Sequence, residues 1–258
     1  MQHLDKEQII SKLHTQNIDV HIVKEISSTN DFFSNSLMHS PSVCVAEKQS
    51  EGRGRIDRAW YSPVETNIYM SLLYKFNIAD LSTISLITGL AVRDAIEKYL
   101  GLPGIKVKWP NDILYEEKKL GGILIESKIF GKSAYVIAGI GVNVNLIESS
   151  KISKPWTSLQ KITNTIHDRN EVISAMINNL LLYYKKFEKE GFSSFIQEWN
   201  DYDILLNQVV RITEDSKIFE GTSLGINSEG NLVLKFDDGE SKCFNYGETS
   251  ILSINFPK

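Results

Sequence analysis

One short segment, residues 52–60 (Gly-Arg-Gly-Arg-Ile-Asp-Arg-Ala-Trp), combines three arginines with two glycines soon after the apolar run 43–46. Arginine presents a planar fork of donors that matches phosphate and carboxylate oxygens. Glycine lets the backbone approach a ligand closely and adopt positive φ angles. The segment therefore predicts a loop that closes over an anionic ligand. On these residues alone, a solvated basic turn or an Arg-Gly segment bound to RNA is an equal alternative.

A second segment, residues 108–112 (Lys-Trp-Pro-Asn-Asp), places a proline inside an apolar stretch. Proline cannot donate to a strand ladder, so it marks a break between two strands, where side chains lie exposed at a rim. Asn111 and Asp112 carry the oxygen ligands that Mg²⁺ prefers. On these residues alone, the segment is typical of an Asn-Asp turn with local hydrogen bonds, and a ligand or metal contact is the alternative.

Two further segments combine glycines with one polar side chain. Lys119 begins Lys-Leu-Gly-Gly at 119–122, and a lysine beside glycines suits a carboxylate or phosphate that approaches the backbone. Asn143 ends Gly-Ile-Gly-Val-Asn at 139–143, and its carboxamide offers a donor and an acceptor to the edge of a base. Neither segment is a dinucleotide-binding fingerprint or a phosphate loop. A hairpin with exposed lysines is the alternative for the first.

Composition narrows the class of protein. The chain has 258 residues, 42% of them apolar, and a formal net charge of −4, which argues against a general nucleic-acid binder. Cys44 and Cys243 lie far apart and show no zinc-ligand spacing. The first residues lack a signal-peptide layout, and no apolar run approaches the roughly 18 residues of a membrane span. We expect a cytoplasmic protein in a reducing compartment, without a membrane partner.

Hydrophobic periodicity predicts an α+β fold for most of the chain. The predicted helices cover 6–13, 83–100 and 173–187, and a further helix begins after 27–30. The predicted strands cover 20–23, 67–74, 105–109, 113–115, 123–125 and 135–142, the last three as an antiparallel meander. Asp5 is a predicted N-cap, and Gly101 and Gly191 are predicted helix ends.

The pattern changes near Asn207, which predicts a domain boundary. Short apolar stretches at 209–212, 232–236 and 251–254 alternate there with turn residues. Short strands at regular spacing predict a small all-β barrel. We therefore expect a catalytic domain at 1–206 and a β-barrel domain at 207–258.

The order of these segments, together with Ser-Thr-Asn at 28–30 and Glu-Lys-Gln-Ser-Glu-Gly-Arg-Gly-Arg at 47–55, resembles the biotin protein ligase (biotin–[acetyl-CoA carboxylase] ligase) family. The resemblance covers about 26–156 and extends to the small C-terminal barrel. It implies a class II synthetase-like, lipoate ligase-like catalytic domain, in which helices pack on a mixed, mainly antiparallel sheet, and an SH3-like C-terminal barrel. It also implies that biotin and MgATP form biotinyl-5′-AMP, and that biotin then passes to one lysine of a biotin carboxyl carrier domain of acetyl-CoA carboxylase or a related carboxylase.

The resemblance also implies roles for individual residues. Biotin contacts are implied for Ser28, Thr29, Asn30, Gln49, Gly52, Arg53, Gly54, Arg55, Lys119 and Gly122. Contacts to ATP or the adenylate are implied for Arg53, Arg55, Arg58, Trp60, Asn111, Lys119, Asn143 and Trp156. Lys119, Arg55 and Arg58 are the implied catalytic residues. Asn111 and Asp112 are the candidate Mg²⁺ ligands.

Three features depart from the family pattern. Asp57 stands where the family loop usually has glycine, and it would pair with an arginine or weaken phosphate binding. Only 27 residues precede Ser28, too few for the helix-turn-helix domain of members that repress transcription, so we expect a single-function ligase without a DNA role. The segment 252–258 has no arginine, whereas some relatives place one near ATP.

Two other functions stay open. A lipoate-type acyl-adenylate ligase uses similar chemistry on a related fold, but its glycine-arginine pattern differs. A non-catalytic nucleic-acid-binding module is the third hypothesis, which the negative net charge disfavours. For the ligase we expect a monomer or homodimer, and a loop at 52–60 that is mobile without ligand and ordered with biotin.

Overall fold

The computed structural model describes residues 3–34, 40–56, 58–77, 81–130, 133–246 and 249–255, and a seven-stranded sheet is its centre. The strands run in the spatial order β1-β2-β3-β7-β6-β5-β4. Their bounds are β1 (Asp19–Ile26), β2 (Ser42–Gln49), β3 (Ile68–Phe76), β4 (Ile105–Lys108), β5 (Asp112–Tyr115), β6 (Lys118–Phe130) and β7 (Ser133–Val142). β1 and β2 pair in parallel, and the other neighbours pair antiparallel. The predicted mixed, mainly antiparallel sheet is confirmed.

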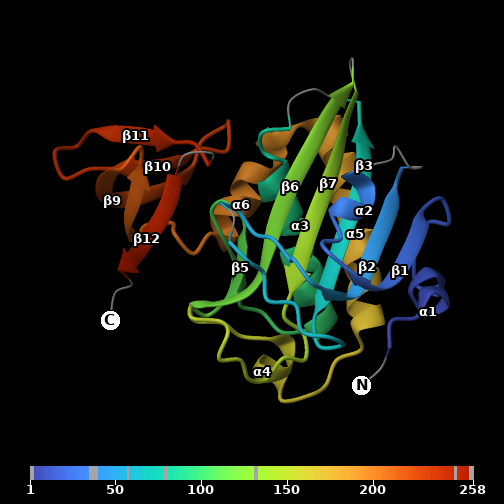
Figure 1. Cartoon of the computed structure of the whole chain (residues 1–258). Helices are drawn as coiled ribbons and strands as arrows, with labels where there is room; N and C mark the ends of the chain where they lie inside the picture. Colours follow the sequence, from blue (N-terminus) through green and yellow to red (C-terminus); the bar gives the residue numbers. More distant parts are fainter. Residues whose placement is uncertain are drawn as a thin grey trace.

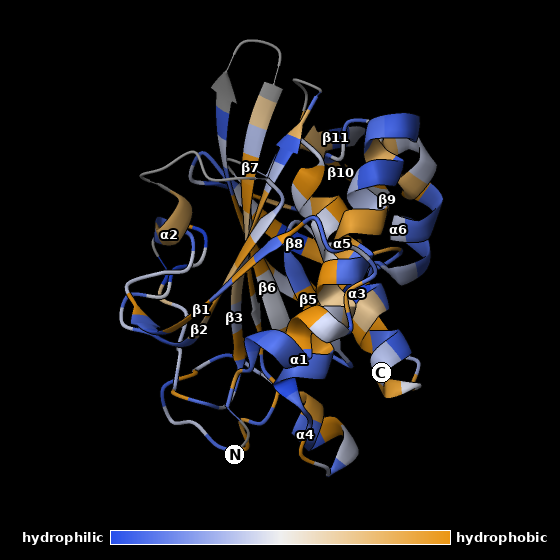
Figure 2. Ribbon diagram, turned by 90° about the vertical axis from the view of Figure 1, so that its right-hand side faces the viewer, coloured by the Kyte–Doolittle hydropathy of each residue, from blue (hydrophilic) through white to orange (hydrophobic). Residues whose placement is uncertain are grey.

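Two long helices cover one face of this sheet, α3 (Ile84–Leu100) and α5 (Arg169–Glu190) (Figure 1). α3 ends at Gly101 with φ 61°, and α5 ends at Gly191, both as predicted. Asp168 caps α5 by accepting a hydrogen bond from a backbone N–H, so the helix begins four residues before the predicted apolar stripe. Figure 2 shows apolar residues concentrated where these helices meet the strands. The opposite face of the sheet carries loops (Figure 1).

The shorter helices were predicted less completely. α1 (Lys6–Ser11) and its Asp5 cap are as predicted, and α2 (Asp31–Ser34) begins directly after Ser-Thr-Asn. Three short helical segments were missed: α4 (Leu159–Thr163), η1 (Phe192–Phe195) and α6 (Ile196–Tyr202). Each has seven residues or fewer, too few to show a clear period. No helix in the described ranges is long and apolar enough to cross a membrane.

The C-terminal part forms a separate five-stranded antiparallel sheet with the order β11-β10-β9-β8-β12. Its strands are β8 (Val209–Glu214), β9 (Lys217–Ile226), β10 (Leu232–Lys235), β11 (Ser241–Phe244) and β12 (Thr249–Asn255). The all-β character is confirmed, although β9 and β11 were missed because polar residues interrupt them. The closed SH3-like barrel and the boundary between 206 and 207 stay predictions.

The two sheets are joined beside β4. Trp109, which is 1% exposed, donates from Nε1 to the Gly230 carbonyl at 3.0 Å. Val107 and Asp203 form a single parallel bridge at the start of the connection to β8. This junction brings β12 toward the loop-covered face of the larger sheet.

Candidate active site

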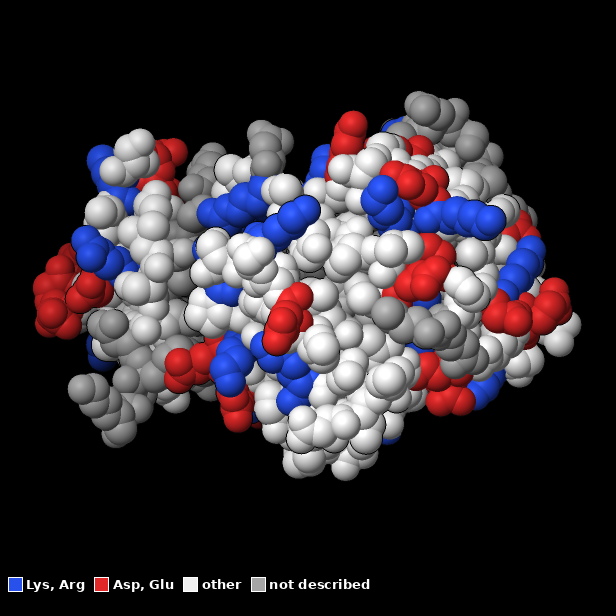
Figure 3. Space-filling view, turned by 60° about the horizontal axis from the view of Figure 1, so that its bottom comes forward, with Lys and Arg blue, Asp and Glu red and all other residues white. Residues whose placement is uncertain are grey.

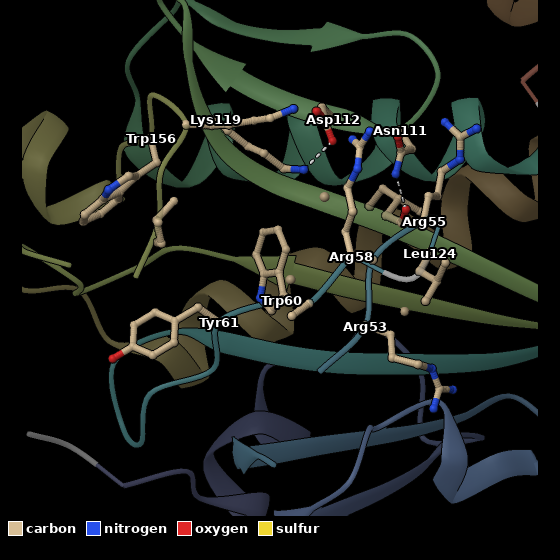
Figure 4. A pocket seen from close by; sticks show the side chains of 18 of the residues that line it. Arg53, Arg55, Arg58, Trp60, Tyr61, Asn111, Asp112, Lys119, Leu124 and Trp156 are labelled. Atoms are coloured by element: carbon tan, nitrogen blue, oxygen red, sulfur yellow. Dashed lines mark hydrogen bonds and ion pairs between the residues drawn. The ribbon is translucent and has the colours of Figure 1, made fainter. Parts of the chain in front are cut away.

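A cavity of about 480 Å³ lies over β6 and β7 among these loops (Figure 4). The lining residues come from many parts of the chain, including 28–30, 53–56, 58–61, 108–112, 151–156, the strands β6 and β7, and two residues of β12. All predicted site residues line it except Gly52. The structure therefore brings together residues that lie more than a hundred positions apart in the sequence.

One end of the cavity is neutral and internally hydrogen-bonded. The backbone N and Oγ1 of Thr29 lie 2.9 and 3.2 Å from Gln49 Oε1. Gln49 then donates from Nε2 to Ser62 Oγ at 3.1 Å. Ser71 Oγ lies 2.7 Å from Thr29 Oγ1 and 2.6 Å from Asn30 Oδ1. Because most of these groups are buried and all are fixed by one another, this end presents a preorganised polar surface without net charge.

The strand glycines make room for protein side chains at this end. A Cβ at Gly139 would lie 2.5 Å from Asn30 Oδ1, and one at Gly141 would lie 2.5 Å from the Trp60 ring. Gly122 pairs with Gly141 across β6 and β7, and its Cβ would lie 3.3 Å from the same ring. Trp60 therefore rests on a floor of glycines, in the middle of the view in Figure 4. The Trp60 Nε1 is buried and lacks a hydrogen-bond partner among the described residues.

The arginine-glycine segment forms a closed loop above that floor. Gly54 N donates to the Arg58 carbonyl at 2.6 Å, and Trp60 N donates to the Gly52 carbonyl at 2.7 Å. A Cβ at Gly52 would lie 2.6 Å from the Trp60 carbonyl, which explains the glycine there. Gly52 thus supports the loop from outside the cavity. Asp57 lies outside the described residues.

Arg53 fastens this loop to the main body. Its side chain points away from the other labelled arginines in Figure 4. Its Nη2 lies 2.7 Å from Asp31 Oδ1 and 3.2 Å from Glu126 Oε1. Burial opposes ionisation of Asp31, but hydrogen bonds from Arg53 and Ser27 outweigh it, and the Asp31 pKa is lowered. These ion pairs hold the loop, and the predicted contact of Arg53 to biotin and adenylate stays a prediction.

The other end of the cavity is cationic. Lys119 Nζ lies 2.6 Å from Asp112 Oδ1 and 5.3 Å from the centre of the Trp60 ring. Burial lowers the pKa of Lys108, Asp112 opposes that shift, and Lys119, Lys154 and Arg58 add to it. This crowding of like charges is unfavourable without a ligand and favours an anion.

Arg55 belongs to the same end. Burial lowers its pKa, Asp112 opposes that shift, and Arg58 adds to it. Its guanidinium donates to the carbonyl of Tyr246, just before β12. In Figure 3, Lys and Arg side chains gather beside the junction of the smaller and larger parts. The loop at 52–60 therefore contacts both parts of the molecule.

Asn111 and Asp112, the predicted metal ligands, are held in different ways. Asn111 donates from Nδ2 to the Ile123 carbonyl at 2.7 Å, which fixes its carboxamide. Asp112 uses Oδ1 for Lys119. The described residues include no group of three His, Cys, Asp or Glu side chains that could hold a metal alone. Mg²⁺ usually binds through one or two carboxylates together with phosphates, so the pair fits an ion that arrives with a nucleotide.

Asn143 and Trp156 lie together at a third part of the wall. Asn143 Nδ2 donates to the Thr157 carbonyl at 3.0 Å, which fixes its side chain next to Trp156. The Thr157 N–H donates to the Lys119 carbonyl at 2.9 Å, so β6 also holds this segment. Lys161 Nζ lies 4.1 Å from the centre of the Trp156 ring. The predicted adenine contacts are thus linked through the backbone to the predicted catalytic lysine.

Several lining residues were not predicted. Those with polar or charged side chains include Tyr61, Lys108, Lys151, Lys154 and Thr249. Lys108 is part of the Lys-Trp-Pro-Asn-Asp motif, so its signal was present in the sequence. Thr249 reaches the cavity only because the C-terminal sheet docks there, and no local pattern marks it.

Comparisons with known proteins agree with this arrangement. The sequence matches the Biotin/lipoate A/B protein ligase family over residues 22–143 and the Biotin protein ligase C terminal domain over residues 205–252. It is 34% identical to the bifunctional ligase/repressor BirA of Salmonella typhimurium, over 98% of this chain and 80% of that protein. The chain therefore belongs to the biotin protein ligase family.

Two further relatives are informative. The biotin–[acetyl-CoA-carboxylase] ligase of Mycobacterium tuberculosis is 32% identical, over 54% of this chain and 52% of that protein. The biotin protein ligase of Aquifex aeolicus, solved in complex with biotin and ATP, superposes with a TM-score of 0.82 and 29% identity. That match covers 91% of this chain and 98% of the Aquifex chain, so both sheets have counterparts there.

Proposed function

We propose that this protein is a biotin protein ligase that uses ATP in two steps. In the first step, biotin and ATP give biotinyl-5′-AMP and pyrophosphate. In the second step, biotin passes to the ε-amine of one lysine on a biotin carboxyl carrier domain, and AMP leaves. The observation that carries this proposal is a single cavity with a neutral, hydrogen-bonded end and a cationic end. The Aquifex aeolicus relative, solved with biotin and ATP, supports it.

The neutral end suits the ureido ring of biotin. That ring is uncharged and offers both donors and acceptors, which Ser28, Thr29 and Gln49 can complement. A buried site made of fixed dipoles rejects ligands that leave its polar groups unpaired. The biotin carboxylate would then extend past Trp60 toward Lys119.

The cationic end suits the first chemical step. The biotin carboxylate attacks the α-phosphorus of ATP, so two anions must come together and pyrophosphate must leave. Lys119, Arg55 and Arg58 offset the repulsion and stabilise charge that develops in the transition state. Mg²⁺, when bound with the nucleotide beside Asn111 and Asp112, would neutralise phosphate charge and polarise the phosphoryl oxygens.

The second step requires that water stay away from the mixed anhydride until the acceptor lysine arrives. The loop at 52–60 covers the cavity and is fastened at Arg53 and Arg55. A closed loop excludes water and preserves the reactive intermediate. Opening near the carrier domain would admit the acceptor amine, which attacks the acyl carbon.

The carrier, as a domain of acetyl-CoA carboxylase or a related carboxylase, is part of the proposal. So are the cytoplasmic location, the monomeric or homodimeric state and the absence of a DNA role. A lipoate-type ligase remains the runner-up, because the matched family includes lipoate ligases. A nucleic-acid-binding module has less support, because the formal net charge of the chain is −4.

The direct test is to mix the protein with biotin, MgATP and a carboxyl carrier domain and to weigh the carrier by mass spectrometry. We expect a gain of one biotin mass. A carrier whose acceptor lysine is replaced by arginine, and reactions with lipoate in place of biotin, serve as controls. An unmodified carrier in the complete mixture, or modification by lipoate in preference to biotin, would reject the proposal.

A further inference from the structure

Strand β12 forms part of the cavity wall. It lies on the side of the five-stranded sheet that faces β5 and β6 (Figure 1). Thr249 and Ile251, two positions apart in β12, both line the cavity. They pair with Glu214 and Ile212 of β8, so the C-terminal sheet holds them in register. The C-terminal part therefore contributes side chains as well as a covering surface.

Thr249, like Trp60, carries a buried polar atom that lacks a hydrogen-bond partner among the described residues. Its side chain is 1% exposed, and its Oγ1 has no hydrogen-bond partner among the residues that the structure describes. By contrast, the Thr29 hydroxyl at the neutral end has protein partners. A buried hydroxyl without a partner is unfavourable, so its presence calls for a compensating role. A ligand that accepts its hydrogen bond would supply one.

The residues near Thr249 indicate which part of a ligand its hydroxyl would contact. Arg55 donates to the Tyr246 carbonyl, three residues before Thr249, and three residues span at most about 11 Å. Arg55 in turn is influenced by the charges of Asp112 and Arg58. We therefore assign Thr249, which lines the same cavity, to the cationic end, which selects anionic oxygens over the neutral ureido ring.

We propose that the Thr249 hydroxyl donates a hydrogen bond to a phosphate oxygen of the bound nucleotide, so that β12 completes the phosphate end of the site. This inference rests on the proposed function. Phosphate oxygens accept hydrogen bonds and carry charge, so a hydroxyl donor there forms a strong bond. Ile251 supplies the apolar wall beside it and excludes water.

The test replaces the hydroxyl without changing the shape of the side chain. Thr249→Val should raise the KM for ATP about tenfold or more in biotin-dependent ATP–pyrophosphate exchange, because a hydrogen bond to a charged group is lost. Its affinity for biotin in calorimetric titration should stay within about twofold. The ligand-free Thr249→Val protein should also melt at a higher temperature than the wild type, because the unpaired hydroxyl is gone.

Two further variants test whether the change in the KM for ATP comes from the Thr249 hydroxyl itself. Thr249→Ser keeps the hydroxyl and should recover most of the ATP affinity that valine loses. Thr222→Val makes the same replacement on β9, away from the cavity, and should leave the KM for ATP unchanged. An unchanged KM in Thr249→Val, or equal losses in the serine and valine variants, would overturn the inference.

The same assay separates this inference from the proposed function. A wild-type protein without biotin-dependent exchange would remove the ligase proposal itself. Normal exchange in the wild type with an unaffected Thr249→Val would remove only the role of Thr249.

Discussion

The two ends of the cavity are built on opposite principles. At the neutral end, Thr29, Gln49 and Ser71 satisfy one another through short hydrogen bonds before any ligand arrives. At the cationic end, Lys108 and Arg55 have lowered pKa values, first because of burial and then because like charges lie nearby. The polar groups of one end are paired with one another, whereas the other end gathers several like charges around the single carboxylate of Asp112.

This difference shows how one cavity can bind a neutral ring and a polyphosphate. A neutral ligand gains most from dipoles that are already oriented, because little reorganisation accompanies binding. A polyphosphate gains most from uncompensated positive charge, because binding relieves repulsion and desolvation together. Variants at the neutral end should therefore change biotin affinity, and variants at the cationic end should change nucleotide binding and chemistry.

The largest expected effect is at Lys119. Lys119→Ala should lower kcat for adenylate formation by about 10²-fold or more, because it removes a cation from the reacting phosphate and carboxylate. Single-turnover formation of biotinyl-5′-AMP measures this step. The control is Lys118→Ala, which removes a neighbouring lysine that is half exposed and pairs with Glu116. Near-normal turnover in Lys119→Ala, or equal losses in both variants, would contradict the role of Lys119.

A smaller effect is expected from the floor of the neutral end. In Gly139→Ala, the new Cβ would lie 2.5 Å from Asn30 Oδ1, and the buried Asn30 side chain must shift. We expect about tenfold weaker biotin binding in calorimetric titration, and overpacking should destabilise the protein by about 1–3 kcal/mol. ATP binding should change much less.

The matched control for this floor is Gly89→Ala in α3. Its new Cβ would meet no atom closer than 3.9 Å, and alanine favours helix over glycine. We therefore expect normal biotin binding and unchanged or higher stability. If Gly139→Ala binds biotin as tightly as Gly89→Ala does, the neutral end is less rigid than the hydrogen bonds indicate.

The sequence predicted the fold and the site residues only in part. α3 and α5 were predicted because apolar residues recur at helical spacing over many turns. β9 was missed because Glu220, Ser223 and other polar residues interrupt its apolar positions. The motif residues were predicted to converge because their order resembles a known family, and no local rule places 28–30 beside 139–143.

The features that the sequence did not predict are tertiary contacts. The ion pairs of Arg53 with Asp31 and Glu126 were not predicted, and its predicted contact to biotin and adenylate stays a prediction. Thr249 carries no motif, and its position depends on how the C-terminal sheet docks. Such contacts join segments that are distant in the chain, so periodicity and spacing contain no information about them.

The smallest expected effect is on the stability of Lys108→Gln relative to the wild type. Its sign should differ between the ligand-free protein and the protein with ATP. The Lys108 pKa is lowered from 10.5, so its charged form is less favourable in the folded than in the unfolded protein. Lys108→Gln should therefore modestly stabilise the ligand-free protein at pH 7. The difference in stability between the variant and the wild type should shrink as the pH rises toward 10.5, because Lys108 of the wild type loses its charge.

With saturating ATP the order of stability should reverse. The wild type should gain more in melting temperature from MgATP than Lys108→Gln does, because ligand affinity adds to folded-state stability. Lys185→Gln, which removes an exposed lysine of α5 outside the cavity, should behave as the wild type in both states. If Lys108→Gln were less stable than the wild type without ATP, the cationic end would not be under repulsion when empty. The contrast between the two ends would then rest on Arg55 alone.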